Sequence, residues 1–212
     1  MGARHGGAGY GRPRRGRRQS KRGARSANPA VAVSLAFERC TAHNVRPMPS
    51  RTTRIEPVSL AQVEALIEGD DVFTARFGMP VASGYLDFPE ALPRTRDELA
   101  NGMPSEWYSH FIIDADTNTV VGFGGYKGPP TDGEVEIGYS VAPSWQRRGH
   151  ATAAALLLIE KARVAGVTRV CAYTLPETNA STRVLTRCGI TMTEVVADAE
   201  MESVWRWERT LS

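Results

Sequence analysis

The sequence predicts a mixed α/β (α+β) domain built on a mostly antiparallel, twisted sheet flanked by helices. Two strand-like segments around a short polar turn predict a hairpin in the first half of the domain. The second half alternates strand-like and helical segments and ends in two further strand-like segments. This order places helices on the faces of a single sheet.

The domain begins with a strand-like stretch at Thr53 (TTRIEPVSL), followed by a helical one (LAQVEALIEG). Ser59 is the expected N-cap of that helix and Gly69 its stop. Residues 71–105 show no long periodic element and are dense in aromatic, proline and glycine residues. Two interpretations of the aromatic side chains remain open: they form the wall of a substrate site, or they fill a core beneath loops.

Residues 107–114 (WYSHFIID) and 119–127 (TVVGFGGYK) form the predicted hairpin. The glycines of the second strand superficially resemble a dinucleotide-binding fingerprint. However, Pro129 and Pro130 stand where the phosphate-binding helix would have to begin. Glycines within a strand more often indicate a bulge or a close backbone approach.

The remaining elements alternate regularly. They are a strand over 134–141, a helix to about Ala165, a strand over 167–174, a helix over 180–188 with Asn179 as its cap, and strands over 191–196 and 203–210. The order of elements is therefore strand–helix–strand–helix–strand, with a last strand that returns.

A long basic segment precedes the globular pattern. Residues 1–54 carry 13 Lys/Arg and a single acid, whereas residues 55–212 carry 13 Lys/Arg and 22 acids. We therefore expect residues 1–50 to be a disordered, basic Arg/Gly-rich N-terminal extension and residues 51–212 to be the folded, acidic domain. The extension favours contact with a nucleic acid or another polyanion. The alternatives are a solvated tail without a role and a true start at Met48.

The cysteines and the apolar runs narrow the class of protein. Cys40, Cys171 and Cys188 lack metal-like spacing, and their odd number argues against a disulfide framework. No apolar run reaches the ~18 residues of a membrane span, and the N-terminus lacks the apolar segment of a secretory signal. We expect a cytoplasmic protein with no metal site and no membrane contact.

The turn at residues 146–151 (QRRGHA) joins the strand over 134–141 to an Ala/Leu-rich helix. Backbone N–H groups at such a helix start point toward one place, where the positive end of the helix dipole adds to them. The turn therefore predicts a phosphate or pyrophosphate site. It lacks the GK[ST] ending of a nucleoside-triphosphate P-loop and the three-glycine spacing of a dinucleotide fold.

This turn has the form Q/R-x-x-G-x-G/A and directly follows a strand that ends in Val-x-Pro, with Trp145 just before it. Together with the segment TLPETNASTRVLTRCGI (174–190), it resembles the GNAT-type N-acetyltransferase superfamily, in the branch that includes ribosomal-protein N-terminal acetyltransferases. The resemblance covers about residues 54–209. It implies the GNAT-like acyl-CoA N-acyltransferase fold and acetyl-CoA as cosubstrate.

The resemblance also implies roles for individual residues. Backbone groups of Tyr139 and Val141 would pair with the pantetheine arm, and N–H groups over 147–152 would surround the pyrophosphate. The implied cofactor-binding residues are Tyr139, Val141, Gln146, Arg147, Arg148, Gly149, His150, Ala151, Thr152 and Asn179. For the two arginines a solvated surface position stays open as the alternative, and for Asn179 a simple N-cap.

The implied catalytic residues are Glu136 and Ser181. Glu136 is the candidate base, with Glu134 on the same face of its strand, or a water, as the alternative. The N–H of Val141 would polarise the thioester oxygen. Leu185 occupies the position where many superfamily members carry a tyrosine acid, so Ser181 or a water would protonate the thiolate, or the thiolate leaves unassisted.

We therefore expect an N-acetyltransferase that acts on a primary amine, either a peptide or protein N-terminus or a small molecule. The acidic charge of the domain favours a cationic acceptor. The alternative is a non-catalytic acyl-CoA-binding regulatory module with the same fold. A homodimer is compatible with the sequence, which does not fix the oligomeric state.

Overall fold

The computed structural model describes residues 53–86, 90–198 and 202–212. These residues form a seven-stranded sheet in the order β1-β2-β3-β4-β5-β7-β6. Its strands are β1 Thr53–Pro57, β2 Ser109–Asp114, β3 Thr119–Tyr126, β4 Glu134–Val141, β5 Arg169–Thr174, β6 Thr191–Asp198 and β7 Glu202–Thr210. Strands β4 and β5 pair in parallel, and the other neighbouring pairs are antiparallel. The predicted mixed, mostly antiparallel sheet is confirmed.

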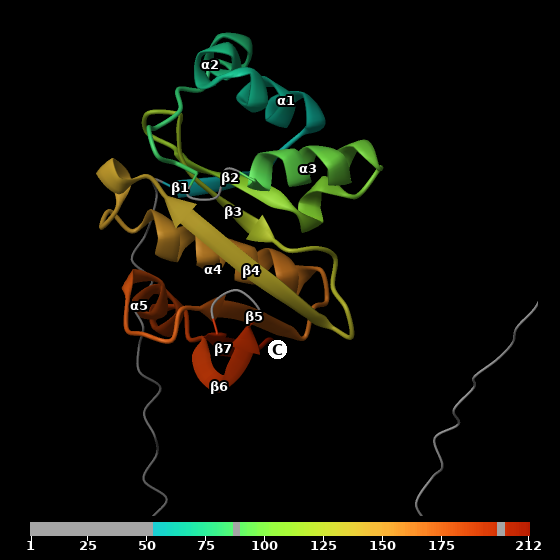
Figure 1. The fold of residues 1–212 in the computed structure, drawn as a ribbon, viewed down its shortest axis with the longest axis vertical. Helices are drawn as coiled ribbons and strands as arrows, with labels where there is room; N and C mark the ends of the chain where they lie inside the picture. The colour runs from blue at the N-terminus through green and yellow to red at the C-terminus, as the bar shows by residue number, and fades with distance from the viewer. Residues whose placement is uncertain (1–52, 87–89, 199–201) are drawn as a thin grey trace, which may run out of the picture. The chain divides into compact units, whose positions relative to one another are not determined.

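Helices cover the sheet on both faces (Figure 1). They are α1 Leu60–Glu68, α2 Asp70–Phe77, α3 Ala91–Ala100, α4 His150–Val164 and α5 Ala180–Arg187, with short 3-10 turns η1 Ser105–Trp107 and η2 Pro143–Trp145. One core joins α4 and α5 to the sheet through residues such as Ile137, Leu158 and Leu185. A second core joins α1–α3 to the opposite face through residues such as Phe73 and Phe111.

Local signals in the sequence explain where several elements begin. The Ser59 hydroxyl accepts from the N–H of Gln62, and the Gln62 side chain accepts from the N–H of Ser59, so a capping box starts α1 as predicted. Asn179 forms the same reciprocal pair with Thr182 at the start of α5. Each cap satisfies N–H groups that the helix itself leaves unpaired.

The segment after α1 contains two helices that its sequence pattern did not predict, α2 and α3. Their apolar stripes are narrow, because α2 buries only Phe73 and α3 buries only Leu92 and Thr95. Phe73 is fully buried and Tyr85 nearly so, and both lie in the core that α1–α3 share with the sheet. For these two aromatic residues the core interpretation is correct. Phe88 lies outside the described residues.

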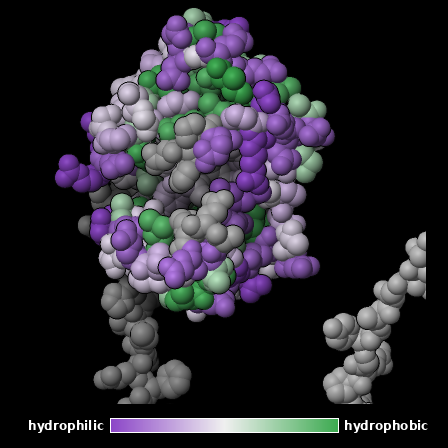
Figure 2. Space-filling view, in the orientation of Figure 1, coloured by the Kyte–Doolittle hydropathy of each residue, from purple (hydrophilic) through white to green (hydrophobic). Residues whose placement is uncertain are grey.

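The half of the sheet formed by β5, β7 and β6 presents a polar surface on the face opposite α4. Glu134 pairs in register with Arg169 and Glu136 with Cys171, so these four side chains share this face. Figure 2 shows the molecule from this side, with hydrophilic and hydrophobic residues mixed over the surface. The charged side chains of Glu134 and Arg169 lie on this face, where they pair with each other.

Some predictions concern parts of the chain outside this description. The basic extension over residues 1–50, with its proposed polyanion contact, lies outside the described residues, as does Cys40. Among the described helices, none combines the length and the apolar character that crossing a bilayer requires.

Candidate functional site

Strands β4 and β5 separate after only three register pairs, of which Glu136–Cys171 is the last. Beyond it, β4 still pairs with β3 as far as Val141. The carbonyl of Glu136 accepts from the N–H of Lys127 at 3.1 Å, so it points toward β3, and at the far end the N–H of Ala142 donates to a β3 carbonyl at 2.8 Å. Because successive residues of a strand point their backbone groups to opposite sides, those of Tyr139 and Val141 point into the gap.

The gap leaves a row of backbone donors and acceptors without a strand partner among the described residues. An extended ligand with amide groups pairs with such an edge as an added strand does. The predicted pairing of Tyr139 and Val141 with a pantetheine arm fits this geometry.

The turn before α4 holds its backbone in the left-handed region at two positions. Arg147 has φ 61° and Gly149 has φ 95°. Gln146 donates from its side-chain nitrogen to the carbonyl of Val141 at 3.1 Å, which fastens the turn to the end of β4. Helix α4 then starts at His150 with no side-chain cap.

The start of α4 fits a phosphate group for two reasons. Its first N–H groups receive no side-chain acceptor, and the helix dipole adds positive charge there. A Cβ built on Gly149 would meet nothing within 4 Å, so the space beside the backbone is open. The uncapped start of α4 therefore has the geometry that the predicted anion site requires.

The side chains of the turn point in different directions. Arg147 and Arg148 are exposed, and the guanidinium of Arg148 lies 4.6 Å from the ring centroid of Trp145. His150, by contrast, is 2% exposed; its Nδ1 lies 2.9 Å from the hydroxyl oxygen of Thr53 and its Nε2 lies 3.8 Å from Asp114. Burial lowers the pKa of His150 despite the nearby carboxylate. Its side chain anchors the turn to the sheet, which leaves its backbone for a ligand.

Helix α5 lies against both β4 and α4. The hydroxyl of Tyr139 donates to the carbonyl of Ser181 at 3.4 Å, and the thiol of Cys188 lies 3.7 Å from the carbonyl of Thr152. The structure thus places the first turn of α5, which contains Ser181, beside β4. The Asn179 side-chain oxygen accepts from the N–H of Thr182 at 3.1 Å, so Asn179 does cap the helix. Leu185 is 1% exposed, in the core.

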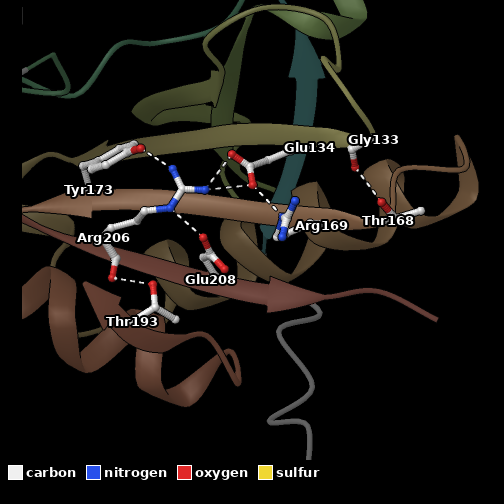
Figure 3. Close-up of polar contacts among 8 residues, drawn as sticks. All are labelled: Gly133, Glu134, Thr168, Arg169, Tyr173, Thr193, Arg206 and Glu208. Carbon is white, nitrogen blue, oxygen red and sulfur yellow. Dashed lines mark hydrogen bonds and ion pairs between the residues drawn. The ribbon is translucent and has the colours of Figure 1, made fainter. Parts of the chain in front are cut away.

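The two candidate bases on β4 have different surroundings, and Figure 3 shows those of Glu134. Glu134 accepts two hydrogen bonds of 2.8 Å from Arg206 and pairs with Arg169 at 2.6 Å. Burial opposes ionisation of Glu134, but Arg206 and Arg169 outweigh it and hold the pKa of Glu134 below its usual value. The carboxylate of Glu136 has no hydrogen-bond or ion-pair partner within the described part of the chain. Burial raises its pKa, against the opposing charges of Lys127, Arg206 and Arg94.

Two hollows open on the face opposite α4. The first, of about 230 Å³, lies among α3, β3 and β4, and its walls include Leu86, Ala91, Arg94, Phe123, Gly138 and Tyr139. The second, of about 520 Å³, is lined by charged residues that include Lys127, Glu134, Glu136, Arg169 and Arg206. Lys127 borders both hollows. Glu136 therefore lines the second hollow, next to the lysine that the two share.

Sequence patterns did not predict the ion pairs around Arg206. Its Nε donates to Glu208 at 2.6 Å and its Nη1 donates to the hydroxyl of Tyr173. The alternation of residues 204–209 does place Arg206 and Glu208 on one face, but the partners on β4 and β5 depend on the order of strands in the sheet. Among the described residues, no group of three or more His, Cys, Asp or Glu side chains is placed to hold a metal ion.

Comparison with known proteins assigns the family. The sequence profile of the acetyltransferase (GNAT) domain matches residues 53–191. A search of curated proteins found no match. Among solved structures, the fold is similar to RimL, a ribosomal L7/L12 α-N-protein acetyltransferase in complex with coenzyme A, at a TM-score of 0.56 with 19% identity over 76% of this chain and 96% of that one.

Two further structures share the fold at similar distance. One is the microcin C7 self-immunity acetyltransferase MccE in complex with acetyl-CoA and AMP, at a TM-score of 0.55 with 16% identity over 76% of this chain and 93% of that one. The other is the ribosomal-protein-S5-alanine acetyltransferase of Vibrio fischeri, at a TM-score of 0.54 with 14% identity over 75% and 93%. With the profile match over most of the described residues, the chain belongs to the GNAT acetyltransferase family.

Proposed function

We propose that the protein is an N-acetyltransferase that moves the acetyl group of acetyl-CoA to a primary amine. The observation that carries the proposal is the open edge of β4 beside the uncapped start of α4. An amide-containing arm that ends in a pyrophosphate fits both features at once. The complexes of RimL with coenzyme A and of MccE with acetyl-CoA support this choice of ligand.

In this proposal the backbone groups of Tyr139 pair with the amides of the pantetheine arm, and the N–H of Val141 faces the thioester end of the arm, while the Val141 carbonyl accepts from Gln146. The N–H groups from Arg147 to Thr152 receive the pyrophosphate, and the φ of 95° at Gly149 lets the backbone turn toward it. The exposed guanidinium groups of Arg147 and Arg148 add positive charge at the mouth of the site.

Glu136 accepts the proton that the amine must lose, directly or through a water. The amine nitrogen then forms a bond to the acetyl carbon, and the bond from that carbon to sulfur breaks. The N–H of Val141, which points into the gap, is placed to polarise the thioester oxygen. The departing thiolate takes its proton from Ser181 or from water, because Leu185 has none to give. Much of the rate comes from holding the two reactants together.

Turnover of acetyl-CoA with a panel of amines tests the proposal, in wild type and Glu136→Gln. We expect acetylated product from wild type and a loss of turnover with retained coenzyme A binding in the variant. Buried Leu185 favours one rival, a non-catalytic acyl-CoA-binding module. Tight coenzyme A binding without turnover of any amine would establish that rival.

A further inference from the structure

The hollow among α3, β3 and β4 lies on the same face of β4 as Glu136. The side chain of residue 138 would point into it, since residues 136, 138 and 140 share one face of the strand. This hollow is therefore the place where an acceptor would meet the acetyl site, in the proposed function on which the present inference rests.

Most polar groups of this hollow already have partners within the fold. The hydroxyls of Thr95 and Ser109 lie 2.7 Å apart, and the hydroxyl of Ser140 donates to the carbonyl of Tyr85 at 3.1 Å. The Tyr108 hydroxyl interacts with Glu98. These hydroxyl groups already have hydrogen-bond partners within the protein, so they contribute little to binding a ligand.

Two cations at the rim are different. Arg94 on α3 and Lys127 after β3 are exposed, line the hollow and make no ion pair within residues 53–86, 90–198 and 202–212. One acid, the exposed Glu90, shares the rim, and Glu136 lies beyond Lys127. Glu98 lies at the Tyr108 hydroxyl of the same hollow. What sets Arg94 and Lys127 apart is therefore that neither has an ion-pair partner in the described part of the chain, inside a domain whose net charge is negative.

The base of the hollow is open at Gly138. A Cβ built there would meet only the Lys127 side chain, with Cε at 3.6 Å and Nζ at 4.0 Å. The ammonium group of Lys127 therefore lies over Gly138, two residues from Glu136 on the same face of β4. Leu86, Ala91 and Phe123 supply apolar walls.

We propose that the acceptor is a small primary amine that also carries an anionic group, of the size of an amino acid. Arg94 and Lys127 would bind the anion by charge-assisted hydrogen bonds, the apolar walls would hold a short side chain, and the amine would lie toward Glu136. The volume of about 230 Å³ is below the range of sites for drug-sized ligands, which favours a small molecule over a peptide. The two cations without ion-pair partners thus favour an acceptor with an anionic group, in contrast to the cationic acceptor that the net charge of the domain predicts.

The test compares L-alanine and L-valine with L-alaninamide, L-valinamide and an alanine-initiated peptide. Binding is measured by calorimetry in the presence of coenzyme A, and acetyl transfer by mass spectrometry. We expect the amino acids to bind and react on the order of tenfold to hundredfold better than their amides, as for the loss of a charge-assisted contact. The double variant Arg94→Ala/Lys127→Ala should remove that preference.

Arg96→Ala is the matched control, because Arg96 lies on the same helix but pairs with Asp97 and does not line the hollow. It should behave as wild type. Gly138→Val should fill the hollow and abolish amino-acid binding while coenzyme A still binds; the backbone there has no positive φ that would strain a side chain.

Other outcomes separate this inference from the proposed function. Equal turnover of the free amino acids and their amides would overturn the inference, as would a preference for the free amino acids that the double variant retains. Either result would still agree with the proposed acetyltransferase activity. Transfer to the peptide without amino-acid binding would also overturn it. Arg94- and Lys127-dependent binding of amino acids without acetyl transfer would support the inference and contradict the proposed function. Absence of amino-acid binding overturns the inference.

Discussion

One guanidinium nitrogen of Arg206 lies 2.8 Å from each carboxylate oxygen of Glu134. Glu136, two residues along the same strand and on the same face, has no such partner within the described part of the chain. Arg206 is itself held by Glu208 and Tyr173 (Figure 3). The ion pairs therefore hold one of the two carboxylates of β4 in place and leave the other, the proposed base, without a partner in the described part of the chain.

Glu136→Gln and Glu134→Gln should consequently differ. We expect kcat to fall about 10²- to 10⁴-fold in Glu136→Gln, the range for loss of a general base. Glu134→Gln should lose stability instead, because Arg206 and Arg169 would lose the carboxylate that they share, although Arg206 keeps its ion pair with Glu208. Kinetics and thermal unfolding of both variants provide the comparison. A large kcat loss confined to Glu134→Gln would reverse the assignment.

The pH dependence follows from the raised pKa of Glu136. The base acts in its ionised form, so the rate should rise with pH through that pKa. Arg206→Ala removes a charge that lowers the pKa, so the rising limb of kcat/KM should move to higher pH. Circular dichroism must show that the variant remains folded. A limb that stays in place would mean that another group titrates.

Gly149→Ala should weaken coenzyme A binding much more than it weakens the fold. The φ of 95° costs an alanine roughly 1–2 kcal/mol of strain, and the new methyl group would enter the open space at the start of α4. Calorimetry with coenzyme A and thermal unfolding separate the two effects. Gly166→Ala is a control with a similar φ of 82° at the far end of the same helix, and it should bind coenzyme A normally.

Asn179→Ala should lower the free energy of unfolding by about 1 kcal/mol, because it removes the N-cap of α5. Ser181→Ala should leave stability nearly unchanged, since only the Ser181 carbonyl takes part in a hydrogen bond to Tyr139. Denaturant unfolding measures both. If Ser181 supplies the proton to the thiolate, its variant loses turnover with no loss of stability, and unchanged turnover assigns that proton to water.

His110 should make the domain less stable in acid. Burial lowers the pKa of its ring from 6.5 to about 4, against a hydrogen bond to the Tyr108 carbonyl. Below about pH 6.5 the unfolded chain binds a proton that the folded chain excludes, so stability falls as pH drops toward 4, by up to about 3 kcal/mol. His150 and Glu134 titrate in the same sense, so the measurement is the difference between wild type and His110→Gln. If the free energy of unfolding depended on pH equally in wild type and His110→Gln, the prediction for His110 would be contradicted.

The strands and the helices with N-cap residues were predictable because their sequence signals are local. The strand over 134–141 agrees with β4, and the caps at Ser59 and Asn179 start the helices that they predict. Helix α3 was not predictable from the sequence, because Pro93 lies in its first turn and only two of its side chains are buried. A short helix with so narrow an apolar stripe gives no periodic signal.

The site was predictable only in part for a related reason. Strand alternation places Glu134 and Glu136 on one face, but it does not show which of them is paired. That depends on Arg206, 72 residues away from Glu134 and brought near by the order β4-β5-β7. The cations at the hollow, Arg94 and Lys127, likewise come from separate elements that only the folded chain brings together.

The separation of β4 from β5 has a mechanical consequence. It divides the sheet into two parts, β1–β4 and β5–β7–β6. The strand pairing that joins these two parts, between β4 and β5, is only three register pairs long. A cosubstrate bound in the gap would extend this pairing and replace the missing backbone hydrogen bonds. Acetyl-CoA would then stabilise the sheet as well as react. Release of coenzyme A would weaken the connection between the two parts of the sheet and the hollow beside them.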